Sequence, residues 1–172
     1  DTGESVALRS GEIVPCQITG CSKGTAGSPG ELKGRFLSAH AIGTIRINGE
    51  NGVYGSTRAQ FAGQKMEVAF AQEVEAGDAE IWTTTSGETP QAYRVKIEKI
   101  SDADPRRNMV LRVVDRELLA QTGGIVQGMS GSPIVQNGRL VGAVTHVLVN
   151  DPTRGYGIFA QTMLEQAERV TE

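Results

Sequence analysis

The sequence predicts an all-β domain that closes with one helix. Short apolar segments follow one another along the chain and are separated by clusters of turn residues. Glycine is abundant, with 22 of 172 residues, whereas aromatic residues make up only 5%; this composition suits short strands joined by many turns. The final segment, Ile158–Val170, instead places its apolar residues at helical spacing. Strand following strand, with one terminal helix, indicates the all-β class.

Length and charge limit the kinds of protein this can be. A chain of 172 residues can form one domain, or two small barrels sharing an interface, with a substantial core. The net charge of −3 gives no reason to expect nucleic acid or an anionic membrane surface as a partner. No apolar run approaches the length of a membrane span, and no signal peptide is visible. Any anchor or export signal is therefore expected outside this sequence.

In the first half, apolar residues mark several short extended segments. A Gly-, Ser- and Pro-rich stretch, Lys23–Gly34, is predicted to be a loop. The predicted strands are 12–14, 17–19, two within Phe36–Tyr54 around the turn Asn48–Gly52, and the alternating segment Gln64–Ala71.

The second half repeats this pattern with clearer turn signals. Glu80–Thr85 and Tyr93–Ile100 are predicted to pair, Asp102–Pro105 is a linker, and Met109–Val114 is the next strand. The apolar runs on either side of Asn137-Gly138, at 134–135 and 140–144, predict a tight β-hairpin.

Cys16 and Cys21 are the only cysteines. The pair allows a disulfide in an oxidising compartment or two free thiols, and both readings stay open. Two cysteines are too few for a zinc site, and the two histidines do not supply a ligand spacing. We expect no metal and no cofactor.

The segment Gly128-Met129-Ser130-Gly131-Ser132-Pro133 is the strongest candidate for a catalytic loop. It places a serine among glycines at the mouth of the predicted hairpin. A serine nucleophile needs a base and donors directed at the oxyanion, and glycine permits backbone angles that let the N–H groups of Gly128 and Ser130 converge. The alternative is a glycine-rich turn in which Ser130 has no chemical role.

Long segments of the chain resemble the peptidase domain of the SpoIVB family, the stage IV sporulation serine peptidases of endospore-forming bacteria. The matching segments stand in the family's order: GTAGSPGELKGRF, GDAEIWTT, NMVLRVVDRELLAQTGGIVQGMSGSP and GAVTHVLVNDPTRGYGIF. The resemblance implies that Ser130 is the nucleophile and that Asp115, fifteen positions earlier, is the acid of a Ser-His-Asp triad.

A serine loop of this form implies chymotrypsin-like antiparallel β-barrels, with the first barrel truncated. We expect residues 1–172 to form one peptidase domain, with 1–107 as the remnant of the first barrel and its connecting strands, and 108–172 carrying the nucleophile and the closing helix. The alternative architecture is a single open barrel without catalytic pairing.

Asp115 has a second interpretation that the spacing itself favours. It ends the strand 111–114 and precedes Arg116-Glu117-Leu118-Leu119, a plausible helical turn, so it is well placed to cap a helix. Only the resemblance assigns it to the triad.

The catalytic base is the open question, since only His40 and His146 are available. In the SpoIVB family the histidine lies in a Gly-His segment just before the stretch that Asp1-Thr2-Gly3 resembles, so the base is expected upstream of this sequence and these residues alone are expected to be inactive. His40, within Leu37–Ala41, is the alternative base, although a histidine in a strand is more commonly a plain sheet residue. Thr145 and His146 are expected to line the substrate-binding strand, since chymotrypsin-like peptidases pair this stretch with the substrate backbone.

By the resemblance, the whole protein has an upstream membrane anchor and a PDZ domain and works in the space between the two forespore membranes. There it would cleave a regulatory membrane protein, which releases an intramembrane protease that activates a late sigma factor. A different class of function is a peptide-binding module that holds a peptide along Ala143–Val149 without cutting it. Unpaired strand edges in a truncated first barrel also predict some tendency to dimerise.

Overall fold

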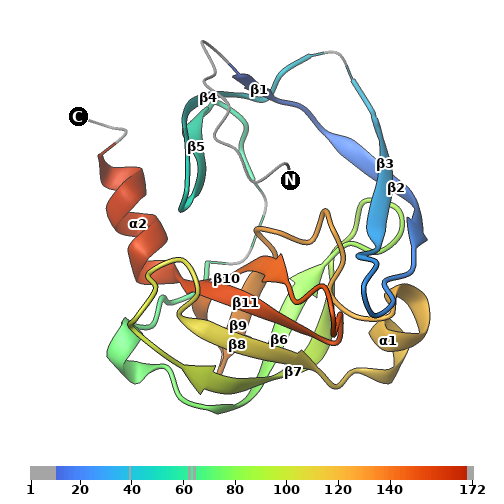
Figure 1. Cartoon of the computed structure of the whole chain (residues 1–172). Coiled ribbons are helices and arrows are strands. Elements are labelled where there is room, and N and C mark those ends of the chain that lie inside the picture. Colours follow the sequence, from blue (N-terminus) through green and yellow to red (C-terminus); the bar gives the residue numbers. More distant parts are fainter. Residues whose placement is uncertain (1–10, 39, 62, 64, 170–172) are drawn as a thin grey trace.

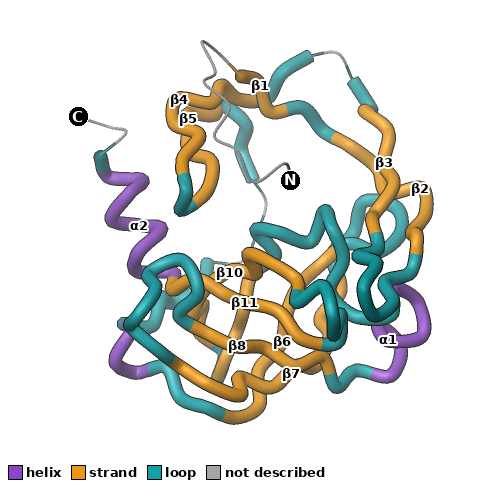
Figure 2. Tube along the Cα trace, in the orientation of Figure 1, coloured by secondary structure: helices purple, strands orange, loops and turns teal. Residues whose placement is uncertain are grey.

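A computed structural model describes residues 11–38, 40–61, 63 and 65–169. These residues form a closed six-stranded antiparallel barrel, two smaller antiparallel sheets and two α-helices (Figures 1 and 2). Around the barrel the strand order is β10-β11-β8-β7-β6-β9. The barrel strands are β6 (Gly77–Thr83), β7 (Gln91–Ile100), β8 (Met109–Val113), β9 (Pro133–Gln136), β10 (Arg139–Val147) and β11 (Arg154–Phe159).

The barrel interior is the hydrophobic core. Along β6, β7 and β8, alternate side chains are buried, as expected for strands with one face toward the core. The largest fully buried side chains come from all six barrel strands, among them Ile81, Ile97, Leu111, Ile134 and Ile158; α1 and the segment before β9 contribute others, including Leu118 and Met129. The predicted hairpin is confirmed: β9 pairs with β10 through Asn137 and Gly138, which both have positive φ (53° and 75°).

The first half forms open sheets rather than a second closed barrel. One has the order β1-β4-β5, and the other pairs β2 with β3; Figure 1 shows the three-stranded sheet standing apart from the barrel. Their bounds are β1 (Gly11–Ile13), β2 (Cys16–Ser22), β3 (Glu31–Phe36), β4 (Gly43–Gly49) and β5 (Gly52–Thr57). The predicted all-β class with a barrel and a closing helix is thus confirmed, with two smaller sheets beside the barrel in the described part of the chain.

Two strand boundaries differ from the prediction. β3 begins inside the predicted loop Lys23–Gly34, because Glu31–Gly34 pair with Ser22–Ile18 of β2, and this pairing outweighs the local turn composition. The predicted strand at Gln64–Ala71 is absent from its described part, residues 65–71. There a single bridge joins Val68 to Leu140, and the 3₁₀ helix η1 (Ala71–Glu73) follows.

The expected internal division at residue 107 falls inside the barrel. β6 and β7 close the same barrel as β8–β11, since β6 pairs with β9 and β7 pairs with β8. The nucleophile-bearing unit therefore includes strands that begin at Gly77. Adjacent strands hydrogen-bond along their length, so no boundary can lie between β7 and β8.

Both helices flank the barrel. α1 (Arg116–Thr122) follows β8, and α2 (Ala160–Glu168) packs against β10, β11 and β5. The predicted closing helix began at Ile158, but Ile158 and Phe159 end β11 and are buried there. Val170 lies outside the described residues. No helix among the described residues is long and apolar enough to cross a membrane.

The two cysteines lie at opposite regions of one strand. Cys16 begins β2 and Cys21 lies five residues further along it, and both thiols are free. At about 3.3 Å per residue, their Cα atoms are separated by roughly 16 Å, far beyond the reach of a disulfide. The sequence allowed either a disulfide or two free thiols, and in the structure the thiols are free. Partial burial raises the pKa of Cys21, an effect that Lys23 and Lys33 oppose.

Candidate active site

The loop around Ser130 is held rigidly to the barrel. Met129 is completely buried and anchors the loop in the core. On the other side of Ser130, the Gly131 N–H donates to the Val144 carbonyl (2.8 Å) and the Val144 N–H donates to the Ser132 carbonyl (2.9 Å). Gly128 and Gly131 have φ of 96° and 90°, angles that glycine adopts readily. These contacts leave the Ser130 side chain exposed on a fixed backbone.

Ser130 and Thr145 are brought together by this loop. The Ser130 hydroxyl donates to the Thr145 carbonyl, with 2.7 Å between Oγ and O. Within the described part of the chain, the backbone N–H groups of Gly128 and Ser130 have no hydrogen-bond acceptor. Two free N–H groups beside a serine hydroxyl are the elements of an oxyanion-binding site.

Beside Ser130 the edge of β10 is open. β9 ends its pairing with β10 at Ala143, so from Thr145 onward this edge faces no other described strand. A cavity of about 190 Å³ lies there. Its walls come from three segments: Pro29, Ile125, Val126, Gln127, Ser130, Thr145, His146, Val147 and Val149. The structure thus places Ser130 with both expected substrate-strand residues, Thr145 and His146.

The loop Gly24–Gly30 supports the walls of this cavity, a role that its sequence did not reveal. The Gln127 N–H donates to the Gly30 carbonyl (2.9 Å), and the Gly27 N–H donates to the Val149 carbonyl (2.9 Å). The Gly24 N–H donates to the Thr122 carbonyl (2.8 Å) at the end of α1. The only sequence signal was the loop's membership of a segment that resembles the SpoIVB family.

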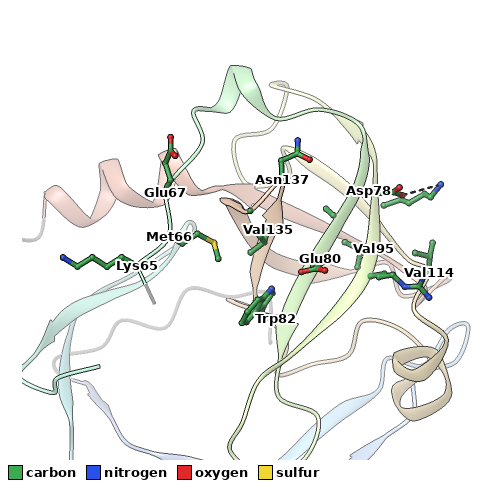
Figure 3. Close-up of a pocket in the computed structure, with 14 residues that line it drawn as sticks. Lys65, Met66, Glu67, Asp78, Glu80, Trp82, Val95, Val114, Val135 and Asn137 are labelled. Atoms are coloured by element: carbon green, nitrogen blue, oxygen red, sulfur yellow. Dashed lines mark ion pairs between the residues drawn. The ribbon is translucent and has the colours of Figure 1, made fainter. Parts of the chain in front are cut away.

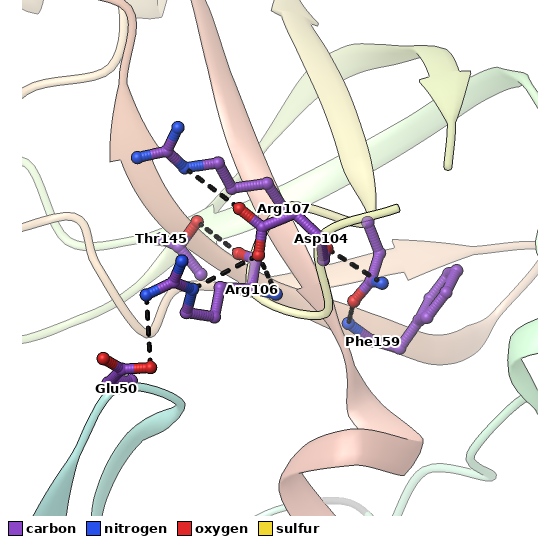
Figure 4. Close-up of polar contacts among 7 residues, drawn as sticks. Glu50, Asp104, Arg106, Arg107, Thr145 and Phe159 are labelled. Atoms are coloured by element: carbon purple, nitrogen blue, oxygen red, sulfur yellow. Dashed lines mark hydrogen bonds and ion pairs between the residues drawn. The ribbon is translucent and has the colours of Figure 1, made fainter. Parts of the chain in front are cut away.

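A second loop, Asp104–Arg107, contacts the side chain of Thr145 (Figure 4). The Thr145 hydroxyl donates to the Arg106 carbonyl (3.4 Å), and Arg106 Nη1 lies 3.2 Å from the Glu50 carboxylate at the β4–β5 turn. Arg107 stacks over the Tyr156 ring at 5.1 Å from its centroid. From the sequence, a linker was predicted at Asp102–Pro105 and no role was assigned to Arg106 and Arg107, because nothing in their local pattern indicates that they lie against β10.

His146 is exposed, but its ring is partly desolvated. This partial burial lowers the pKa of His146, the nearby Arg107 and Arg106 lower it further, and Asp104 opposes them. A lowered pKa favours the neutral imidazole near pH 7. No hydrogen bond joins His146 to Ser130 in the described structure, since the Ser130 hydroxyl is directed at Thr145.

Asp115 is the N-cap of α1. Its Oδ1 accepts hydrogen bonds from the N–H groups of Glu117 (2.9 Å) and Leu118 (3.2 Å), and its Oδ2 accepts a longer one from the Arg94 N–H (3.3 Å). Burial alone would raise the pKa of Asp115, but these donors and the Arg94 guanidinium lower it below its ordinary value. The carboxylate does not line the cavity beside Ser130. The capping interpretation is confirmed, and the structure does not join Asp115 to Ser130.

His40 is also separate from the serine loop. Its side chain is exposed, its backbone N–H donates to the Ser38 hydroxyl (2.9 Å), and it does not line the cavity. Among the described residues, no group of three or more His, Cys, Asp or Glu side chains could hold a metal ion.

A larger cavity, of about 730 Å³, shares no lining residue with the cavity beside Ser130 (Figure 3). It is formed by β6, β7, β9 and the segment 65–67, with Trp82 on its floor. Its lining includes both acidic and basic side chains, and it contains no serine, cysteine or histidine. We therefore place the candidate site at the smaller cavity, where a nucleophile is present.

Comparisons with known proteins identify the family and the fold. Residues 1–164 match the sequence model of one protein family, which is described as SpoIVB peptidase S55. Among solved structures, the fold is similar to that of the inactive form of Rv3671c from M. tuberculosis H37Rv, crystallised as a serine-to-alanine mutant. The TM-score is 0.51 at 16% sequence identity, and the match covers 94% of this chain and 80% of that one. At this identity the likeness supports the fold alone. No curated protein matches the chain.

Proposed function

The chain belongs to the SpoIVB peptidase S55 family, and we propose that it is a serine endopeptidase domain in which Ser130 is the nucleophile. The observation that carries the proposal is the local geometry of Ser130. Its hydroxyl is exposed on a rigid loop, beside two free N–H groups and an open strand edge. A substrate carbonyl placed between the hydroxyl and the Gly128 and Ser130 N–H groups would meet both the nucleophile and the oxyanion donors.

The chemistry follows that of acyl transfer to serine. A base removes the Ser130 proton as Oγ bonds to the carbonyl carbon, and the N–H groups of Gly128 and Ser130 stabilise the negative oxygen. The tetrahedral intermediate collapses as the C–N bond breaks, and the base returns the proton to the leaving amine. Water then attacks the acyl-serine by the same steps and releases the second product. Before attack, the Ser130 hydroxyl must turn from the Thr145 carbonyl toward the base.

We propose that the base comes from the upstream Gly-His segment of the family rather than from His40 or His146. Two features support this assignment: His40 has no contact with the serine loop, and His146 stands on the wall of the substrate cavity. Residues 1–172 alone are then expected to have little activity, because oxyanion stabilisation and binding supply only part of the rate enhancement of a complete triad.

Asp115 remains the proposed acid, on the family resemblance. In the described arrangement Oδ1 caps α1, while Oδ2 accepts only the longer bond from the Arg94 N–H. Oδ2 is therefore the oxygen that would accept from an incoming imidazole, and the helix cap would hold the carboxylate in place. This role requires the histidine to approach from the Arg94 side.

For the substrate, we propose a regulatory membrane protein whose cleavage releases an intramembrane protease and so activates a late sigma factor. The proposed location is extracytoplasmic, between the two forespore membranes, by way of an upstream anchor. Both proposals rest on the family resemblance.

The test is active-site labelling with a fluorophosphonate reagent. We expect labelling of a chain that includes the upstream Gly-His segment, loss of labelling in its Ser130→Ala variant, and little labelling of residues 1–172. Ser132→Ala is the matched control, since Ser132 lies on the same loop and should retain labelling.

Two results would count against the proposal. Labelling of residues 1–172 that is lost in His40→Ala would make His40 the base. Failure of the extended chain to label would favour a peptide-binding module instead.

A further inference from the structure

The cavity beside Ser130 has the position and lining of a pocket for one substrate side chain. We propose that it receives an uncharged aliphatic side chain, such as that of valine or leucine, from the residue before the scissile bond. This inference rests on the proposed function, because the scissile bond is placed by Ser130.

Geometry determines which substrate residue faces the cavity. An extended peptide added along the open edge of β10 hydrogen-bonds to its backbone and projects alternate side chains to each side. The acceptor nearest the nucleophile is the Thr145 carbonyl, 2.7 Å from Ser130 Oγ. A substrate N–H that bonds there belongs to the residue whose carbonyl meets Ser130. The side chain of that residue lies at the cavity, which Ser130 and Thr145 both line.

The lining excludes a charged occupant. The walls include the aliphatic residues Ile125, Val126, Val147 and Val149, and no Lys, Arg, Asp or Glu lines the cavity. Ile125 and Val126 are each only 2% exposed, so their part of the wall is apolar, while Gln127, Ser130, Thr145 and His146 add polar groups to the rest of the lining. A lysine, arginine or carboxylate side chain in the cavity would lose water without gaining a counter-charge, which strongly disfavours it.

The size of the cavity is compatible with such an occupant. Its volume is about 190 Å³. A branched aliphatic side chain fits this space, and its burial is favourable in proportion to the apolar area covered. The backbone bonds from Gly30 and Gly27 to the two walls hold the cavity at this width.

Val149 allows the inference to be tested by redesign. Its side chain is 47% exposed at the cavity, so a carboxylate there remains solvated and costs the fold little. Val149→Asp would give the cavity the counter-charge that it lacks. Val53→Asp is the matched control: Val53 is 53% exposed on β5 and does not line the cavity.

The experiment measures binding of acetylated tetrapeptide acids that differ only in the last residue: Val, Leu, Lys or Asp. Chemical-shift titration of the Ser130→Ala chain removes nucleophilic attack from the measurement, so the result does not depend on whether Ser130 is catalytic. We expect the Val and Leu peptides to bind about tenfold or more tightly than the Lys and Asp peptides. Val149→Asp should raise the affinity for the Lys peptide several-fold, and Val53→Asp should leave it unchanged.

Equal or tighter binding of the Lys or Asp peptide to the Ser130→Ala chain would overturn the inference, as would binding of none of the peptides at millimolar concentration. An aliphatic preference without fluorophosphonate labelling of the extended chain would keep the inference while removing the peptidase assignment. Fluorophosphonate labelling of the extended chain without the aliphatic preference would keep the peptidase assignment and overturn the inference about the cavity.

Discussion

At the scale of single residues, Asp115 has the capping role that its position in the sequence predicted. Its Oδ1 caps α1 through the N–H groups of Glu117 and Leu118. Its Oδ2 accepts a longer bond from the Arg94 N–H, and its side chain is 16% exposed. The cap is therefore observed, whereas the role of Asp115 as triad acid stays a proposal.

The cap makes a prediction for stability. Asp115→Ala should lower the free energy of unfolding at pH 7 by about 1–2 kcal/mol, because two N-terminal N–H groups of α1 lose their acceptor. Asp115→Asn should recover most of this loss, since asparagine is also a good N-cap, although its amide NH₂ would face the Arg94 N–H. Urea unfolding monitored by circular dichroism measures both changes. Equal losses in the two variants would contradict a capping role.

The same residue predicts a pH dependence. The pKa of Asp115 is lower in the folded chain than in the unfolded chain, so its stabilising effect is present above the unfolded value of about 3.9. As pH falls through the folded pKa, that effect is lost. The stability difference between the wild type and Asp115→Ala should therefore shrink below about pH 4. A difference that stays constant from pH 7 to pH 3 would show that the ionised carboxylate is not the stabilising form.

At the scale of elements, the end of α1 determines how the segment leading to Ser130 is placed. Gly123 ends the helix with φ of 77°, and its N–H donates to the Leu119 carbonyl (3.0 Å). A Cβ at this position would lie 2.3 Å from the Gly24 carbonyl oxygen. The helix end, the loop Gly24–Gly30 and the cavity wall are therefore packed together at backbone distance.

This close packing predicts unequal effects of two glycine substitutions. Gly123→Ala should lower the free energy of unfolding by about 2–4 kcal/mol, because left-handed backbone strain adds to overpacking against Gly24. Gly138→Ala is the matched control: its φ is 75°, but a Cβ there meets open space, so only the strain of about 1–2 kcal/mol applies. Urea unfolding of both variants gives the comparison, and losses of the same size would show that Gly24 yields without cost.

At the scale of the whole molecule, the hydrophobic core belongs almost entirely to the barrel. Every buried member of the main cluster lies between Ala69 and Phe159. Of the preceding residues that the structure describes, Cys21 and Leu32 are the ones that pack against it, and Tyr54 is the one buried hydrophobic side chain in the open sheets there. The barrel therefore buries much more apolar side-chain surface than the open sheets do, and burial of this surface stabilises the fold.

We expect this inequality to appear in hydrogen exchange. Amides of β7 and β8 should exchange only through global unfolding, whereas amides of β1, β4 and β5 should open at a markedly lower free energy. Exchange followed by mass spectrometry of peptic peptides measures both regions in one experiment. Equal opening free energies in β4 and β7 would show that the open sheets and the barrel unfold as one cooperative unit.

Local sequence pattern predicted part of the fold and the candidate nucleophile. Apolar segments between turn residues predicted strands at β6, β7 and β8, the Asn137-Gly138 pair predicted the β9–β10 hairpin, and the Gly-Met-Ser-Gly loop identified Ser130 as the nucleophile candidate. These signals are local because strands and positive-φ turns depend on neighbouring residues.

Contacts between distant segments depend on the tertiary fold. The extension of the barrel back to Gly77, the support of Gln127 and Val149 by the loop Gly24–Gly30, and the cavity beside Ser130 all join segments far apart in the chain. Segment 65–71 alternates like a strand, yet among the described residues it forms only the bridge between Val68 and Leu140. Such contacts depend on which strands close the barrel and on the packing of their loops, and local periodicity carries no record of either.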